Sequence, residues 1–279
     1  MIVETAPAKI NLALHVRRRR ADGYHDIETL FAFATDGDTV TLARSDADSF
    51  TVTGPFADAL TPKPGQGRDA NLVTRAADAF TTIFGIADRH AIVLDKHLPI
   101  ASGIGGGSAD AAATLRGLAR LHAVDPADPR LVGIAAELGA DVPACLAGRT
   151  ALGTGRGDTL VPLDGLAGTP LLLVNPRVAI STAAVFAGWD GVDRGPIPAG
   201  DLLERARAAR NDLEPAALAI APAIAAVLAT LHAAEGVRLA RMSGSGATCL
   251  ALFDDAAARA TAALAVRSAG CWDLETTIA

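Results

Sequence analysis

A cluster of glycines just before the middle of the chain constrains its fold more than any other feature. The glycines fall within a short stretch, at Gly103, Gly105, Gly106 and Gly107. Ser108 and Asp110, which are residue types that begin helices, follow with a run of alanines. Glycine lets the backbone approach a ligand closely, and a helix N-terminus offers unpaired N–H groups and a positive dipole end. The stretch predicts a phosphate-binding turn that opens a long helix; the alternative is a flexible loop with an N-cap.

The two common nucleotide-binding motifs do not fit this turn. A Walker A loop ends in Gly-Lys-Ser/Thr, and here no lysine follows the glycines. A dinucleotide site needs a glycine where Ser108 stands, and Asp125 lies in a Val-Asp-Pro loop rather than at a strand end. A different kind of phosphate site is therefore indicated.

Composition limits the class of protein. The 279 residues are 50% hydrophobic and 20% charged, with a net charge of −6. Such a chain can bury a large core, and its acidic balance disfavours general nucleic-acid binding. The length suggests two domains, and we place their boundary near Leu163, giving domains 1–162 and 163–279.

Cysteine and histidine usage indicates neither a disulfide framework nor a metal site built by the protein. The cysteines Cys145, Cys249 and Cys271 are far apart, and the histidines show no HxxxH or HExxH spacing. No signal peptide is visible at the N-terminus. A cytoplasmic location is the expectation.

One uncharged segment, residues 215–234, is long enough to span a membrane. Pro222 interrupts it, and its larger side chains form one helical stripe at Ile224, Val227, Leu228 and Leu231. We therefore expect a helix packed on a core.

Periodicity and turn residues predict the remaining elements. Strands are expected at 10–16, with one face buried, and at 39–42, 50–53, 91–94, 159–163, 171–174, around Leu239 and at 248–253. Helices are expected at 71–84, from the glycine turn through Leu121, and at 256–268. Exposed connections are expected at 17–23, 55–68 and 188–200.

Three segments in order along the chain, residues 6–12, 99–113 and 242–248, resemble the motifs of the GHMP kinases. The resemblance implies an α+β, two-domain GHMP kinase fold, with a ribosomal-protein-like N-terminal half and a ferredoxin-like C-terminal half. Segments 22–25, 29–31, 71–76, 139–143 and 211–214 resemble those of a member that phosphorylates a cytidine diphosphate substrate.

The same resemblance implies the ATP site. It assigns ATP to Pro99, Ile100, Ala101, Ser102, Gly103, Ile104, Gly105, Gly106, Gly107, Ser108 and Ala109, with Asn71 and Lys96 meeting the adenine. Ala109 departs from the family, which usually has a second serine there, so only a side-chain contact is lost. Mg2+ is expected to arrive with ATP and to touch Ser108.

Two residues are implied in catalysis. Asp141 corresponds to the base that takes the proton of the substrate hydroxyl, although an isolated aspartate there is more often a helix cap or turn residue. Lys9 corresponds to a lysine paired with Asp141, although sequence alone favours a lysine that reaches solvent from a strand edge.

The substrate is assigned to Asn11, Tyr24, His25, Thr182 and Phe186, where an aromatic plane and an imidazole suit a nucleobase. The alternatives are surface residues for Tyr24 and His25, and an N-cap and a core aromatic for the last two. The four arginines 17–20 are expected to be a solvated loop. The expected partners are small molecules, with no nucleic acid or membrane, and the chain is expected to be a monomer or weak homodimer.

Two rival functions stay open at this point. One is another small-molecule GHMP kinase, such as a homoserine kinase, against which the Gly-Tyr-His segment at 23–25 argues. The other is a ribosomal-protein-like RNA-binding module, against which the acidic charge argues.

Overall fold

The computed structural model describes residues 1–60 and 71–279, which form two compact units. Unit 1 comprises Met1–Ala8, Asp36–Ile100 and Gly105–Gly148. Unit 2 comprises Lys9–Thr35, Ala101–Ile104 and Arg149–Ala279. The long strands β1 (Ile2–Arg19) and β2 (His25–Ser45) each run from one unit into the other, so neither unit is a single segment of sequence.

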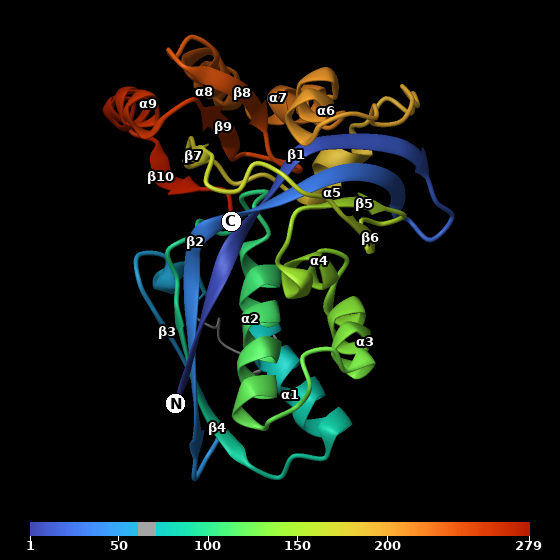
Figure 1. Cartoon of the computed structure of the whole chain (residues 1–279), viewed down its shortest axis with the longest axis vertical. Coiled ribbons are helices and arrows are strands. Elements are labelled where there is room, and N and C mark those ends of the chain that lie inside the picture. Colours follow the sequence, from blue (N-terminus) through green and yellow to red (C-terminus); the bar gives the residue numbers. More distant parts are fainter. Residues whose placement is uncertain (61–70) are drawn as a thin grey trace. The chain divides into compact units, whose positions relative to one another are not determined.

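Unit 1 packs helices against strands. Strand β4 (Arg89–Asp95) pairs in parallel with β3 (Ser49–Thr53) and antiparallel with the end of β2. The helices gather on one side of these strands (Figure 1). They are α1 (Leu72–Phe84), α2 (Gly106–Leu121), α3 (Pro129–Leu138) and α4 (Val142–Ala147), and a short 3-10 helix, η1, spans Ala57–Leu60.

Local sequence explains where α1 and α2 begin. Asn71 caps α1, because its side chain accepts a hydrogen bond from Val73 N, and Gly85 ends the helix at φ 65°. The alanines of α2 lie on its buried face. Gly117 lies there too, and an added Cβ would come within 2.3 Å of Leu42 Cδ1, so a larger residue does not fit. Helix α2 starts at Gly106, earlier than the predicted start at Ser108 or Asp110, because Gly105 adopts the left-handed conformation (φ 65°) that turns the chain into the helix.

Unit 2 contains an antiparallel sheet in the order β10-β7-β9-β8, covered by helices (Figure 1). Its strands are β7 (Pro170–Asn175), β8 (Val237–Met242), β9 (Cys249–Phe253) and β10 (Trp272–Thr277). Strands β5 (Ala151–Thr154) and β6 (Thr159–Pro162) extend the first part of β2. The helices are α5 (Thr182–Ala187), α6 (Leu202–Ala208), α7 (Glu214–Ile220), α8 (Ala223–His232) and α9 (Ala256–Ser268).

The segment 215–234 forms two helices, α7 and α8, rather than one, and Pro222 stands at the break as the N-cap of α8. Its predicted stripe, Ile224, Val227, Leu228 and Leu231, is buried in the core of unit 2, which confirms the packed helix. Within residues 1–60 and 71–279, no helix has both the length and the apolar character needed to cross a membrane.

Strand β1 differs from its prediction in two ways. Residues 10–16 are buried on both faces, polar Asn11 and His15 included, so the strand is not half-exposed. The strand continues through Arg17, Arg18 and Arg19, which do not form a connection, because their side chains bind carboxylates and a main-chain carbonyl. Of the predicted connection 55–68, residues 57–60 form η1, and positions from 61 onward lie outside the described residues.

Candidate active site

In unit 2, part of the glycine segment is bonded to the turn after β8. Thr248 N donates to Ser102 O at 3.0 Å, and Ser243 Oγ donates to Gly103 O at 3.1 Å. A Cβ at Gly103 (φ 78°) would lie 2.5 Å from Ser243 O, so only glycine allows this approach. Two of the predicted motifs, far apart in sequence, are therefore joined in unit 2.

Asn11 connects the first motif to the same turn. Its main-chain N donates to Ser243 Oγ at 3.1 Å, and its Nδ2 donates to Thr29 Oγ1 at 2.7 Å. Lys9 Nζ donates to Asn11 Oδ1 at 3.1 Å and lies 5.3 Å from the centre of the Phe31 ring. Lys9 is only 3% exposed, so it does not reach solvent as a strand-edge lysine would.

The residues predicted to hold a base also lie in unit 2. The His25 ring lies 5.0 Å from the Phe186 ring, tilted by 37°. Thr182 Oγ1 and Ser245 Oγ share a hydrogen bond of 3.0 Å. Tyr24 is 52% exposed, and the guanidinium of Arg156 lies 5.3 Å from its ring centre. Thr182 is thus bonded to the serine-rich turn, Phe186 of the same helix packs on His25, and Tyr24 presents an open aromatic surface.

Unit 1 holds the rest of the glycine segment, at the start of α2. Gly105 is the N-cap, so Gly106, Gly107 and Ser108 form the first turn, whose N–H groups have no partners within the helix. Ser108 is partly exposed, whereas Ala109 is buried. The chain thus directs backbone donors and a dipole end at the position that the sequence predicts for phosphate.

A buried ion cluster lies beside Gly106 of this turn. Lys96 Nζ donates to Asp38 Oδ2 at 2.5 Å and to Asp110 Oδ2 at 2.7 Å, and none of the three side chains is more than 3% exposed. Asp38 Oδ1 also accepts from His97 N and Leu98 N. A Cβ at Gly106 would lie 3.1 Å from Lys96 Nζ. The ammonium of Lys96, predicted to meet adenine, is therefore engaged by carboxylates next to the turn.

The charges in this cluster do not balance. Burial, with the negative charge of Asp38 adding to it, raises the pKa of Asp110 to about 7 against the opposing effect of Lys96. Burial also lowers the pKa of Lys96, but the two carboxylates outweigh it, so the net shift of the Lys96 pKa is upward. Asp110 Oδ1 is buried without a hydrogen-bond partner in the described chain.

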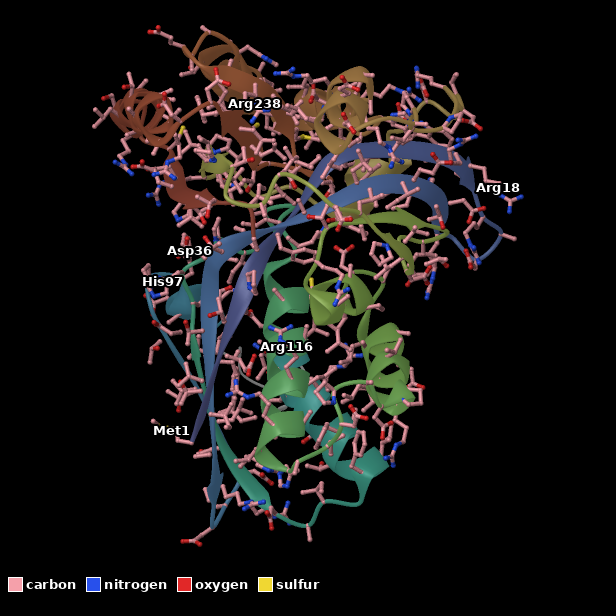
Figure 2. All side chains as sticks on the ribbon, viewed as in Figure 1. Met1, Arg18, Asp36, His97, Arg116 and Arg238 are labelled. Atoms are coloured by element: carbon pink, nitrogen blue, oxygen red, sulfur yellow. The ribbon has the colours of Figure 1, made fainter. Side chains whose placement is uncertain are left out.

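Asp141 stands at the N-cap position of α4 with φ −84° and ψ −16°, and its carbonyl accepts from Cys145 N at 3.1 Å. Helix α4 is held to α2 by Arg116, labelled in Figure 2, whose Nη1 donates to Cys145 O at 2.9 Å. Asp141 belongs to unit 1 and Lys9 to unit 2, so their predicted pairing stays a prediction. The Oδ1 of Asn71, predicted to meet adenine, caps α1 at 2.8 Å from Val73 N.

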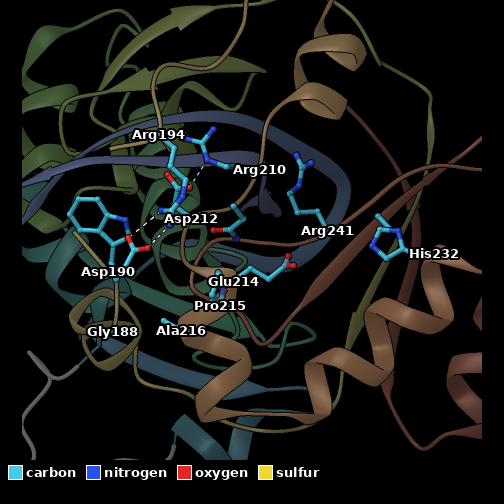
Figure 3. A pocket seen from close by; sticks show the side chains of 13 residues that line it. Gly188, Asp190, Arg194, Arg210, Asp212, Glu214, Pro215, Ala216, His232 and Arg241 are labelled. Carbon is cyan, nitrogen blue, oxygen red and sulfur yellow. Dashed lines mark hydrogen bonds and ion pairs between the residues drawn. The ribbon is translucent and has the colours of Figure 1, made fainter. Parts of the chain in front are cut away.

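Unit 2 also has a cavity of about 390 Å³ that none of the predicted site residues lines (Figure 3). Four of its charged groups form ion pairs, Arg194 with Asp190 and Arg210 with Asp212 at 2.6 Å, and Arg241 bonds to main-chain carbonyls. In residues 1–60 and 71–279, no group of three His, Cys, Asp or Glu side chains could hold a metal ion.

Sequence reasoning missed several of these residues. Ser243 lies inside the motif at residues 242–248, which is the signal from which its link to Asn11 could be proposed. Asp38 gives no sequence signal, because it acts through a partner distant in sequence, and Thr29 lies in a segment that supports the resemblance but whose bond to Asn11 only the fold reveals. Asp110 is predicted as a helix-start residue, whereas in the structure it is a buried ion-pair partner of Lys96.

Family models match two parts of the chain. The model of the GHMP kinases N terminal domain matches residues 71–149, and that of the GHMP kinases C terminal matches residues 195–270. The predicted domain boundary near Leu163 falls between these ranges and remains a prediction.

Named relatives are similar over nearly the whole chain. The 4-diphosphocytidyl-2-C-methyl-D-erythritol kinase of Rhizorhabdus wittichii is 57% identical, covering 97% of this chain and 92% of its own. That of Sphingopyxis alaskensis is 52% identical, covering 96% and 95%. A crystal structure of 4-(cytidine 5'-diphospho)-2C-methyl-D-erythritol kinase matches with a TM-score of 0.81, 34% identity and 99% coverage of both chains. A homoserine kinase structure from Cytophaga hutchinsonii, at 20% identity and a TM-score of 0.73, shares the fold.

Proposed function

Because the chain belongs to the GHMP kinases, we propose that it transfers the γ-phosphate of ATP to the 2-hydroxyl of 4-diphosphocytidyl-2-C-methyl-D-erythritol, a step of the non-mevalonate route to isoprenoid precursors. The expected two-domain α+β fold is confirmed. The observation that carries the proposal is the high identity to kinases of that name along almost the whole chain. Another small-molecule kinase or an RNA-binding module is not favoured.

Phosphoryl transfer to an alcohol needs orientation, a proton acceptor and stabilisation of charge on the transferred group. We assign the proton acceptor to Asp141. The buried ammonium of Lys9 is assigned to the substrate hydroxyl and to keeping the acceptor ionised, since a nearby cation favours a carboxylate.

ATP is assigned to residues 99–109, supported by the backbone donors at the start of α2. Mg2+ bound to the nucleotide supplies charge neutralisation, and Ser108, partly exposed in the first turn of α2, is the residue proposed to touch it. Asn71 caps α1, and Lys96 lies beside Gly106 in the ion cluster. We therefore propose that both support the nucleotide site through the elements they fix as well as through contact.

The cytidine of the substrate is assigned to Tyr24, His25 and Phe186. Asn11 and Thr182 are assigned to the same substrate. The exposed ring of Tyr24 suits stacking, and the packing of His25 on Phe186 supports a planar ligand there. The remaining proposals are a cytoplasmic enzyme that acts on small molecules, as a monomer or weak homodimer.

A coupled assay of ADP release tests the proposed function. The cytidylyl-methylerythritol substrate, homoserine and mevalonate are compared at equal concentrations with saturating ATP and Mg2+. We expect turnover with the first at least about a hundredfold above the other two, because a site built to hydrogen-bond one ligand rejects those that leave it unpaired. Equal turnover with homoserine would overturn the substrate assignment. RNA retained on filters and released by salt would favour the RNA-binding module.

A further inference from the structure

The arginine run 17–20 contains one member with a different kind of partner. Arg17, Arg18 and Arg20 pair with carboxylates. Arg19 Nη2 instead donates to two main-chain carbonyls, Ala187 O at 2.9 Å and Trp189 O at 3.0 Å. Ala187 is the last residue of α5 and Trp189 follows it, in the region where a helix leaves acceptors without internal partners. Arg19 therefore holds the end of α5 against β1.

The segment that Arg19 holds carries two aromatic rings that enclose His25. Phe186 lies 5.0 Å from the His25 ring, and Trp189 lies 5.8 Å from it at an angle of 82°. Trp189 is 5% exposed, and its main-chain N donates to Phe186 O at 3.2 Å. The orientation of His25 thus depends on the position of this segment.

Two nitrogen atoms in this group of rings have unused hydrogen-bonding capacity. His25 Nε2 and Trp189 Nε1 are both buried without a hydrogen-bond partner in the described chain. Burial, and next the charge of Arg19, lowers the pKa of His25, so the imidazole is neutral at pH 7. A neutral imidazole has one donor and one acceptor nitrogen. Buried polar groups without partners are costly, which points to a ligand that this group of rings is built to receive.

We propose that Arg19 and Trp189 are positioning residues for a pyrimidine base: Arg19 fixes the end of α5, Trp189 fixes the His25 ring, and His25 reads the edge of the base. The inference rests on the proposed function, because that function supplies the cytosine. Cytosine presents an amino donor where uracil presents a carbonyl acceptor. An imidazole held in one orientation can distinguish the two, whereas a mobile one adapts to both.

The test compares Arg19→Gln, Trp189→Ala and Trp189→Phe with two matched controls. Arg18→Gln removes an exposed arginine of the same strand, which projects outward in Figure 2 and pairs with Asp26. Trp272→Phe changes the other tryptophan. The readouts are kcat and KM for the cytidylyl substrate, for its uridylyl analogue and for ATP.

Arg19→Gln and Trp189→Ala are expected to raise the KM for the cytidylyl substrate about tenfold and to reduce the cytidine-over-uridine ratio of kcat/KM at least about fivefold. The KM for ATP stays within about twofold, Trp189→Phe recovers part of the ratio, and both controls match the wild type. A ratio that stays unchanged while KM rises would show a merely structural role and would overturn the proposal.

Calorimetric titration with CDP and UDP separates this inference from the proposed function, and Arg19→Gln serves if Trp189→Ala does not fold. Tighter binding of CDP than UDP by the wild type, lost in Arg19→Gln, supports the positioning role whether or not the substrate is turned over. Wild-type turnover together with unchanged CDP preference in Arg19→Gln overturns the positioning role alone. A wild type that binds neither nucleotide and shows no turnover overturns both.

Discussion

At the scale of single residues, Asp141 gives the most direct prediction. Asp141→Asn removes the proton acceptor and keeps the size of the side chain, so kcat should fall by about 10²–10⁴ while the affinity for an ATP analogue stays nearly unchanged. Steady-state kinetics and calorimetry measure the two quantities. Asp128→Asn is the matched control, because Asp128 caps α3 through its side chain and asparagine can do the same. Near-normal kcat in Asp141→Asn would remove it from catalysis.

Asp110 predicts a pH dependence of stability. Its pKa is raised from 3.8 to about 7 in the folded chain, so between about pH 4 and 7 the folded state binds more protons than the unfolded state. The contribution of Asp110 is present at low pH and lost as pH rises. Asp110→Asn should therefore gain stability relative to the wild type over this window, by up to about 1.4 kcal/mol per pH unit.

Urea unfolding at half-unit steps from pH 4.5 to 8 measures this difference. Glu137→Gln, at an exposed position of α3, is the control and should follow the wild type at every pH. Parallel curves for Asp110→Asn and the wild type would contradict the buried-carboxyl explanation.

Residue-level roles were the part of the site that sequence could supply least. The resemblance assigns Asn11 and Lys9 to the site, and the structure adds Thr29 and Ser243 as partners of Asn11, and Asn11 as a partner of Lys9. The ion pair of Lys96 with Asp38 joins residues far apart in sequence, and no local pattern signals such a contact. Long-range pairing of polar groups therefore needs the fold before it can be inferred.

At the scale of elements, prediction succeeded where local signals decide the structure. Asn71 marks the start of α1, and residues 256–268 form α9 as expected, with Asp255 as the cap. It failed where tertiary contacts decide. Strand β2 runs over His25–Ser45, far beyond the predicted 39–42, because β4 and β5 pair with different parts of it. Strand β10 was missed, since its partner β7 lies about a hundred residues earlier.

A pair of histidines joins two elements of unit 1 and predicts sensitivity to acid. His90 on β4 and His122 at the end of α2 have Nε2 atoms 2.8 Å apart. Burial is the main cause that lowers the pKa of both histidines from 6.5. The positive charge of Arg44 adds to this effect, and the negative charge of Asp88 opposes it. Below about pH 6.5 the unfolded chain binds more protons, so this stabilising contribution is lost as pH falls through the lowered pKa values.

His122→Gln should therefore reduce the loss of stability between pH 7.5 and 5.5, although its stability at pH 7.5 is expected to be lower. The denaturation midpoint at the two pH values is the measurement. His232→Gln is the control, because His232 is an exposed residue in the last turn of α8 and its replacement should leave the acid response unchanged. If both variants lose as much stability in acid as the wild type, the pair does not sense pH.

At the scale of the whole molecule, the sequence order of the motifs does not follow the compact units. The glycine segment 99–109 is divided between them, since Ala101–Ile104 belongs to unit 2 and the residues on either side belong to unit 1. The compact units are therefore built from interleaved segments, and the predicted domain boundary near Leu163 remains a prediction. The resemblance could supply the fold as a whole, but the interleaving of β1, β2 and the glycine segment comes from the structure.

Ligand-dependent stability tests the two ligand assignments separately. A ligand that binds only the folded state at about 100 times its Kd stabilises it by about 2.7 kcal/mol. We expect a non-hydrolysable ATP analogue and CDP each to raise the free energy of unfolding of the wild type by about this amount. The measurement is the shift of the denaturation midpoint. Gly106→Val should abolish the shift with the ATP analogue, because its Cβ would lie 3.1 Å from Lys96 Nζ and its two methyl groups would force the glycine turn away from the buried ion cluster. The shift with CDP should remain, since the base residues belong to unit 2.

Gly133→Ala in α3, where an added Cβ meets nothing within 4 Å, should keep both shifts. An unchanged response of Gly106→Val to the ATP analogue would exclude the glycine turn as the phosphate site, and loss of both shifts would show that the substitution disturbs the fold instead.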